Sequence, residues 1–93
     1  MLKNELTSRE RARLRGQAQI IEPVVMVGRA GITEGVVSAL DFALTEHELV
    51  KVRFQDFKED VKSLSEQLAE KTDSSLVCTT GFTAVFYREN PEK

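Results

Sequence analysis

Residues 23–37, with the sequence PVVMVGRAGITEGVV, combine a short apolar strand, a four-residue glycine loop and the start of a helix. The glycines at the two ends of the loop, Gly28 and Gly31, let the backbone turn sharply and approach a ligand without a Cβ in the way. Thr33 is placed to cap the helix, so exposed amide groups and the positive helix end face whatever the loop contacts. A phosphate group is the ligand that such a loop suits best.

Glycine loops of this kind are common, and this one lacks the spacing of two well-known phosphate motifs. No Gly-Lys-Ser/Thr follows it as in a P-loop, and Gly28, Gly31 and Gly35 do not form the GxGxxG pattern of dinucleotide-binding proteins. Taken alone, the loop is equally well explained as a plain turn between a strand and a helix. The remainder of the chain has to distinguish the two interpretations.

The 93-residue chain is expected to form one domain over residues 1–93, with a polar tail at 89–93. Hydrophobic residues make up 41% of it and charged residues 30%, without an apolar run near the ~20 residues of a membrane span and without a signal-peptide segment. These features predict a soluble cytoplasmic protein. A single cysteine and a single histidine exclude an internal disulfide and a Cys/His metal site.

The charges are distributed unevenly along the chain, although the net charge is only −2. Residues 1–31 carry six Lys or Arg against three acidic residues, and residues 32–93 carry seven against twelve. Such asymmetry indicates an interaction surface more reliably than the total does. The basic part contains the glycine loop.

The hydrophobic periodicity predicts seven secondary-structure elements. In chain order they are a helix over 7–18, a strand over 24–27, a helix over 33–46, a strand over 50–54, a helix over 56–71 and two strands over 76–80 and 83–88. Right-handed crossovers make the first three strands parallel, and a closing hairpin makes the last one antiparallel. We therefore expect an α/β, two-layer α-β-α-β-α-β-β fold with a mixed four-stranded sheet.

Two helix starts show the spacing of a capping box. Thr7 precedes Glu10 by three residues, and Asp56 precedes Glu59 in the same way. In this arrangement each side chain bonds the backbone N–H near the other residue. The pairs predict where the first and third helices begin.

The apolar pattern also indicates which faces of the sheet are covered. The strand at 24–27 is apolar at every position, which predicts cover on both faces, with the first helix as a candidate for the second cover. The second and third helices most simply share one face of the sheet. Lys51 and Arg53 alternate with apolar residues in the next strand and are expected on the other face.

Basic residues outside the loop have two interpretations each. The four arginines of the first helix accompany only one acidic residue, Glu10, so they form either a solvated face or a face for phosphates. Lys51, Arg53 and Arg88 can present their charge on the sheet or lay their stems over core residues. The four helical arginines are Arg9, Arg11, Arg13 and Arg15.

No residue pattern in the chain predicts catalysis. His47 lies between two glutamates at a helix end, where a structural role is the common one. Cys78 lies in a strand without a basic neighbour in the sequence to activate its thiol. Glu59 and Asp60 are adjacent on a helix and point in different directions, so they form no acid/base pair.

Four stretches of the chain, in order and at the family's spacing, resemble a CRM domain, the small RNA-binding domain of the YhbY-type ribosome-associated proteins. They are residues 23–36, 14–18 (LRGQA), 47–52 (HELVKV) and 86–88 (FYR). The third residue of the glycine loop, Ala30, departs from the polar or basic residue that is often found there, and the family's closing Leu-Tyr-Arg has Phe in place of Leu. The alanine leaves a backbone contact possible at that position.

The resemblance implies a fold like that of the C-terminal domain of translation initiation factor 3 and a GxxG loop like that of KH domains. It also implies a role, since bacterial members of the family are associated with precursors of the large ribosomal subunit, whereas plant organelle relatives act in intron splicing. A free-standing domain this short fits the bacterial type. Combined with the charge pattern, it predicts RNA contacts by Gly28, Arg29, Ala30, Gly31, Arg9, Arg11, Arg13, Arg15, Lys51 and Arg88.

We therefore expect a monomeric RNA-binding protein that recognises the phosphate backbone of ribosomal RNA and uses no cofactor, metal or small-molecule substrate. An alternative is a protein-interaction module whose acidic third helix docks a ribosomal protein, with the GxxG only a turn. A third possibility, an enzyme acting on a phosphate-bearing small molecule, lacks a general base.

Overall fold

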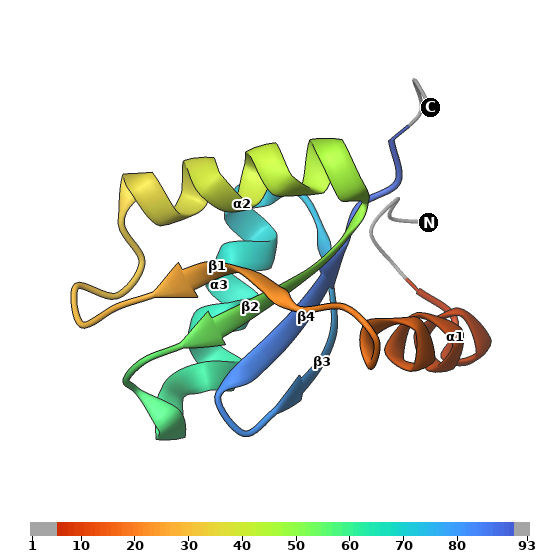
Figure 1. Cartoon of the computed structure of the whole chain (residues 1–93), viewed down its shortest axis with the longest axis horizontal. Helices are drawn as coiled ribbons and strands as arrows, with labels where there is room; N and C mark the ends of the chain where they lie inside the picture. The colour runs from red at the N-terminus through yellow and green to blue at the C-terminus, as the bar shows by residue number, and fades with distance from the viewer. Residues whose placement is uncertain (1–5, 91–93) are drawn as a thin grey trace.

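A computed structural model describes residues 6–90 of the chain (Figure 1). Their α-β-α-β-α-β-β order confirms the predicted α/β class, and residues 91–93 of the expected polar tail lie outside the described part. None of the helices within 6–90 is both long enough and apolar enough to cross a bilayer. The elements are α1 (Ser8–Ala18), β1 (Pro23–Val27), α2 (Glu34–His47), β2 (Leu49–Phe54), the 3-10 helix η1 (Lys58–Asp60), α3 (Val61–Thr72), β3 (Ser75–Thr80) and β4 (Thr83–Tyr87).

The strands form one mixed sheet in the order β1-β2-β4-β3. β1 is parallel to β2, and β4 is antiparallel to both β2 and β3, so the first three strands share one direction as predicted. The hairpin between β3 and β4 turns at Gly81, whose φ of +57° is unfavourable for residues with a side chain. β4 lies between β2 and β3, and β1 stands at one edge of the sheet, where it leads into the glycine loop.

Helices α2 and α3 pack on the same face of the sheet and enclose the main core. The alternate residues of β2 point into this core, where Val50, Val52 and Phe54 are buried beside Leu40 and Leu44 of α2. The apolar face of the strand, which repeats every two residues, therefore packs against the apolar face of α2, as the hydrophobic pattern predicts. Further members of this core are Val25, Val27, Ala43, Val61, Leu68, Ala69, Ala84 and Phe86.

Helix α1 packs on the opposite face of the sheet, over β3 and β4. Its buried residues Leu14 and Ala18 contact Val77 of β3 and Val85 of β4. In Figure 1, α1 lies at one end of the sheet and the loop between β1 and α2 lies at the other. The helix thus covers only part of this face.

The prediction that β1 is covered on both faces is wrong. Val25 and Val27 are buried under the helices, but Val24 is 60% exposed and Met26 is 51% exposed. α1 leaves them uncovered, because its main contacts are with the other three strands. We use the name open face for the uncovered part of the sheet, which carries Val24, Met26, Lys51, Arg53 and Thr83.

One of the two predicted capping boxes is present. The Thr7 side chain accepts from the Glu10 N–H at 3.1 Å, and the Thr7 N–H donates to the Glu10 carboxylate at 3.0 Å. The second box is wrong: Asp56 accepts from the adjacent Phe57 N–H, and Phe57 adopts a left-handed conformation with φ of +66°. The 3-10 turn η1 follows, and α3 begins only at Val61, without a side-chain cap.

Candidate nucleic-acid interface

The glycine loop is a tight turn at one end of the molecule, between the last residue of β1 and the start of α2. The Gly31 N–H donates to the Gly28 carbonyl at 3.0 Å, which closes the turn. Gly31 has a φ of +75°, a region that favours glycine, whereas Gly28 has no positive φ. A Cβ added at Gly28 would lie 3.6 Å from Gln55 Oε1, which is an ordinary contact. The fold therefore favours glycine at position 31 but not at position 28.

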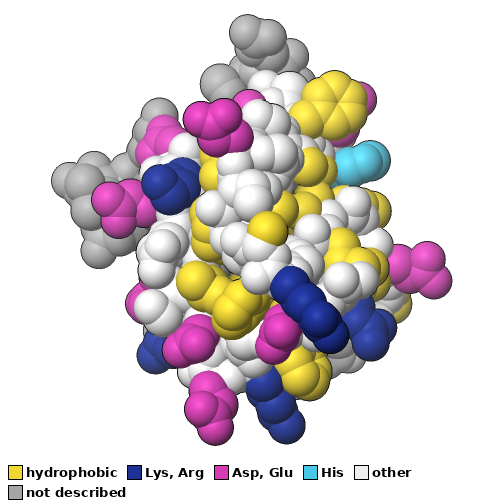
Figure 2. Space-filling model, turned by 90° about the vertical axis from the view of Figure 1, so that its left-hand side faces the viewer, with side chains coloured by type: hydrophobic (Ala, Val, Ile, Leu, Met, Phe, Trp, Pro, Cys, Tyr) yellow, Lys and Arg dark blue, Asp and Glu magenta, His cyan; other side chains and the backbone are white. Residues whose placement is uncertain are grey.

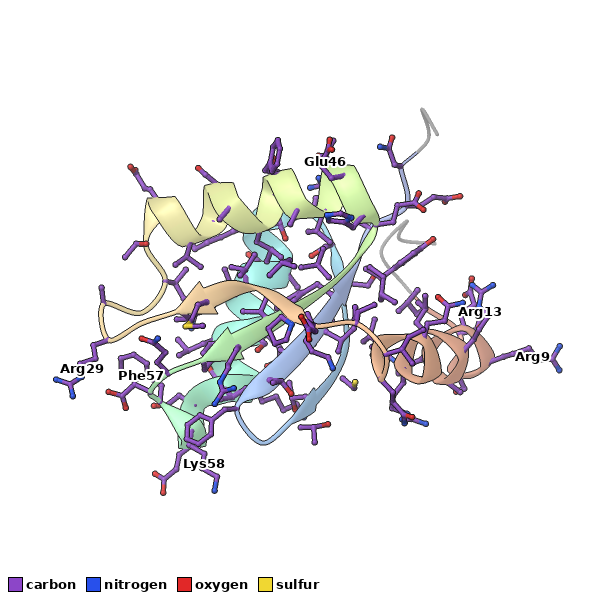
Figure 3. All side chains as sticks on the ribbon, viewed as in Figure 1. Arg9, Arg13, Arg29, Glu46, Phe57 and Lys58 are labelled. Atoms are coloured by element: carbon purple, nitrogen blue, oxygen red, sulfur yellow. The ribbon has the colours of Figure 1, made fainter. Side chains whose placement is uncertain are left out.

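The segment after β2 lies directly beside the glycine loop. The Gln55 N–H donates to the Val27 carbonyl at 2.8 Å, and the Phe57 ring lies 3.9 Å from where a Cβ of Gly31 would be. In Figure 3, Arg29 points outward from the loop tip, and Phe57 and Lys58 lie at the same end of the molecule. This end therefore presents two cations, Arg29 on the glycine loop and Lys58 on the segment after β2.

Lys58 is not among the RNA-binding residues predicted from the sequence. Its ammonium nitrogen lies 5.7 Å from the centroid of the Phe82 ring, which comes from the β3–β4 turn and is 39% exposed. A cation above an aromatic ring is stabilised by the negative face of the ring. The contact joins two loops that are far apart in the sequence, so no local pattern could have predicted it.

The space-filling view of this end shows that its charge is mixed. Lys and Arg side chains alternate there with Asp and Glu, and hydrophobic side chains are visible between them (Figure 2). The acidic side chain Glu34 lies in the first turn of α2, and the Val36 N–H already donates to Thr33 Oγ1 at 3.2 Å. Glu34 and the bond to Thr33 therefore make the N-terminus of α2 a poor site for a phosphate.

The arginines of α1 divide into one that fixes the helix and three that are exposed. Arg11 Nη1 donates to the Leu76 carbonyl and, at 2.8 Å, to the Val77 carbonyl, where β3 has an irregular register. Its guanidinium thus satisfies backbone groups at a sheet edge. Figure 3 shows Arg9 and Arg13 pointing outward from α1, at the end of the molecule opposite Arg29. Exposed are Arg9, Arg13 and Arg15.

Arg15 and Lys51 line one hollow between α1 and the sheet. Cys78, Thr83 and Val85 line the same hollow, so it opens onto the open face. Lys51 is half-buried, and its neighbour across the sheet is Val85. The structure therefore brings Lys51 together with α1 rather than with the glycine loop.

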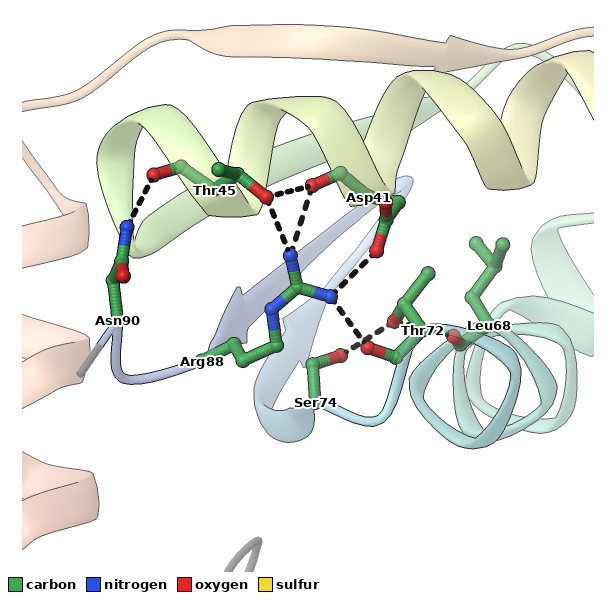
Figure 4. A network of polar contacts seen from close by, with 7 residues as sticks. All are labelled: Asp41, Thr45, Leu68, Thr72, Ser74, Arg88 and Asn90. Atoms are coloured by element: carbon green, nitrogen blue, oxygen red, sulfur yellow. Dashed lines mark hydrogen bonds and ion pairs between the residues drawn. The ribbon is translucent and has the colours of Figure 1, made fainter. Parts of the chain in front are cut away.

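Arg88 lies away from the other predicted site residues, in a polar network on the helical side of the sheet (Figure 4). Its Nη1 donates to Asp41 Oδ1 at 2.6 Å and to the Thr72 carbonyl at 2.7 Å. Its Nη2 donates to the Asp41 carbonyl at 3.0 Å and to Thr45 Oγ1 at 2.9 Å. The guanidinium thereby ties the end of β4 to both α2 and α3.

Within residues 6–90, no group of three His, Cys, Asp or Glu side chains could hold a metal ion. Among the side chains described, the pKa is shifted clearly for Glu10 and Tyr87, and neither lies at the glycine loop. Hydrogen bonds from the Thr7 backbone and side chain lower the Glu10 pKa, and burial raises the Tyr87 pKa. The first shift follows from the capping box of α1, and the second from the packing of β4.

Comparisons with known proteins agree over most of the chain. The family profile of the CRS1 / YhbY (CRM) domain matches residues 6–88. A Pseudomonas aeruginosa protein, named as the probable RNA-binding protein PA4753, is 34% identical over 94% of this chain and 85% of its own length. A Haemophilus influenzae protein, named as an RNA-binding protein, is 35% identical over 94% of this chain and 89% of its own length. The solution structure of the Staphylococcus aureus protein SAV1595 is similar, with 38% identity, a TM-score of 0.85 and coverage of 96% of this chain and 94% of that one.

Proposed function

Because this chain belongs to the CRS1 / YhbY (CRM) domain family, we propose that it is an RNA-binding protein, without enzymatic activity, that binds ribosomal RNA in precursors of the large ribosomal subunit. The relatives named as RNA-binding proteins support the class of ligand. The ribosomal target is inferred from the role that the family resemblance implies for bacterial members.

The observation that carries the proposal is Gly28. Its backbone is compatible with a side chain and a Cβ would have room, so the fold gives no reason for glycine at this position. A glycine that the fold does not need is explained by a ligand that approaches the backbone closely. The exposed Arg29 beside it supplies a charge for the phosphates of that ligand.

The experiment compares two charge reversals in RNA binding at several salt concentrations. Arg29→Glu is expected to weaken binding to a fragment of precursor large-subunit RNA and to lower the salt slope by about one phosphate contact. Lys62→Glu makes the same change in net charge on an exposed position of α3 and is the matched control. Equal salt slopes for the two variants would contradict the assignment of Arg29.

A second candidate function is docking of a basic ribosomal protein on the helical side. The observation that favours it is Phe42 of α2, which is 68% exposed, together with exposed acidic residues on α3 such as Glu66 and Glu70. Gly28→Asp separates the two functions, because it places a negative charge in the loop at a position with room for a side chain. Loss of affinity for naked RNA supports the loop as the contact, and unchanged affinity supports protein docking.

A further inference from the structure

The open face combines exposed apolar side chains with basic ones in neighbouring strands. Met26 of β1 is paired with Arg53 of β2, and Arg53 is paired with Thr83 of β4. Side chains at paired positions point to the same side of a sheet, so these three form one row. Lys51 and Val24 belong to the part of the face nearer to α1, where both line a hollow beside the start of β1.

The apolar part of the open face is unusual for an edge strand. Val24 and Met26 are each more than half exposed, and Ile20, which precedes β1, is 88% exposed and lines the same hollow as Val24. An exposed apolar edge strand risks pairing with other chains, so such side chains call for a ligand that covers them. Glu22 is the acidic side chain beside this hollow, and Lys51 and Arg53 supply the positive charge of the face.

The open face also lies between the two separated groups of exposed arginines. Arg29 extends from one end of the molecule and Arg9 and Arg13 from the other (Figure 3), and the longest extent of the molecule is 32 Å. That length is too great for a single phosphate or nucleotide to reach both groups. The open face offers an RNA strand a path between the two ends.

The apolar side chains discriminate between paired and unpaired RNA. In an RNA duplex the base faces are stacked inside the helix, and a protein meets mostly phosphates and 2′-hydroxyl groups. In an unpaired segment the base faces are accessible and can lie against apolar side chains while cations bind the backbone. Val24 and Met26 among Lys51 and Arg53 match the second arrangement.

We propose that the open face binds an unpaired segment of RNA, with its bases against Val24 and Met26 and its phosphates against Lys51 and Arg53. This inference rests on the proposed RNA-binding function and adds the class of RNA and its path. The glycine loop holds the backbone at one end of the segment, and Arg15 of α1 lies at the other. The competing ligand for the apolar strip, which consists of Val24 and Met26, is a second copy of this chain.

The first test measures binding of an unpaired oligouridylate of about 10 nucleotides and of a duplex of the same length. The double variant Val24→Thr/Met26→Gln keeps exposed side chains of similar size in the strand and removes the apolar contact. We expect about tenfold weaker binding of the unpaired RNA and less than about a twofold change for the duplex. The matched control is Phe42→Gln, which replaces an apolar residue on α2 that is also more than half exposed. This variant is expected to bind both RNAs as the wild type does.

The second test uses Cys78, the single cysteine of the chain, as a probe. It lines the hollow with Arg15 and Lys51 at the border of the open face, so RNA on this path slows its reaction with a thiol reagent severalfold. An unchanged reaction rate with saturating RNA overturns the path. Self-association of the RNA-free protein that the double variant abolishes overturns it too, because the strip is then an interface between copies.

The outcomes separate this inference from the proposed function. A protein that binds neither of these RNAs nor the precursor fragment refutes the proposed function and the inference together, and one that binds the precursor fragment alone refutes the inference. Binding that favours the duplex, or binding of unpaired RNA that the double variant leaves unchanged, refutes the inference alone and leaves the glycine loop as the RNA contact. A thermal unfolding measurement on each variant confirms that the fold is retained.

Discussion

Replacing Arg88 with methionine tests whether this residue serves the fold or an RNA ligand. The substitution keeps a long apolar stem and removes the guanidinium of a side chain that is 22% exposed. Of the four lost contacts, the ion pair with Asp41 contributes least, because the Asp41 side chain is 58% exposed, and such a pair stabilises by about 0.5 kcal/mol. The bond to the carbonyl of the buried Thr72 matters more, since a hydrogen bond from a charged donor contributes roughly 1.5–3 kcal/mol.

We therefore expect Arg88→Met to lower the free energy of unfolding by about 2–4 kcal/mol. With a urea m-value of about 1.5 kcal/mol/M, the midpoint of unfolding falls by roughly 1.3–2.7 M. Asp41→Asn removes the ion pair but keeps an acceptor oxygen, so it is expected to cost only about 0.5 kcal/mol. Urea unfolding followed by circular dichroism measures both changes.

RNA binding at a temperature where Arg88→Met is folded completes the test. If the guanidinium is occupied within the protein, the salt slope of binding stays as in the wild type. The reasoning is refuted if the variant unfolds within about 0.5 kcal/mol of the wild type and the salt slope falls by about one contact. That result would indicate that Arg88 contacts RNA, as the sequence predicts.

Three further predictions concern stability. Gly16→Ala in α1 is expected to stabilise by about 0.5–1 kcal/mol in thermal unfolding, because an added Cβ meets nothing within 4 Å. Burial raises the Tyr87 pKa above 10.0, so its contribution to stability is complete below pH 10 and is lost as the pH rises through the raised pKa. Unfolding midpoints of Tyr87→Phe should lack this alkaline loss. The bonds from Thr7 lower the Glu10 pKa from 4.5, so its contribution is present above that pH and is lost as the pH falls through the lowered pKa. Helicity measured against pH should fall less steeply in Glu10→Gln.

Local sequence patterns predicted which segments form helices and strands. They did not predict which strands lie next to each other in the sheet. The alternation of Val50, Val52 and Phe54 with charged residues identified β2 because its period is a property of the segment itself. The insertion of β4 between β2 and β3 depends on which strands pair, and no single segment carries that information. The start of α3 was missed because Asp56 and Glu59 have capping spacing, while Phe57 breaks the helix with a positive φ.

The covered and uncovered sides of β1 could not be told apart from the sequence. Val24 and Met26 are as apolar as Val25 and Val27, so the pattern predicts burial for all four. Hydrophobicity indicates that a side chain favours cover, but it does not say whether protein or ligand provides the cover. The exposed pair is thus an error of the sequence-based prediction and also the observation on which the proposed RNA path depends.

The roles of the arginines were beyond sequence analysis for a related reason. Arg11 and Arg88 are held by backbone carbonyls of segments more than 15 residues away, at the irregular part of β3 and at the end of α3. Arg9 and Arg13 occupy the same helix as Arg11 without such carbonyls in the contacts described. Which arginine becomes structural therefore depends on where the folded chain leaves carbonyl groups unpaired.

The two glycines of the GxxG loop provide different information when they are substituted. Gly31→Ala strains a backbone with φ of +75°, so a loss of RNA binding in that variant mixes loss of structure with loss of contact. Gly28→Ala introduces a Cβ where there is room and where the φ is ordinary, so the fold should be as stable as before or slightly more stable. A loss of RNA affinity in Gly28→Ala can then come only from the space that the new methyl group takes from the ligand. The motif is symmetric in the sequence, but only its first glycine isolates RNA contact from folding.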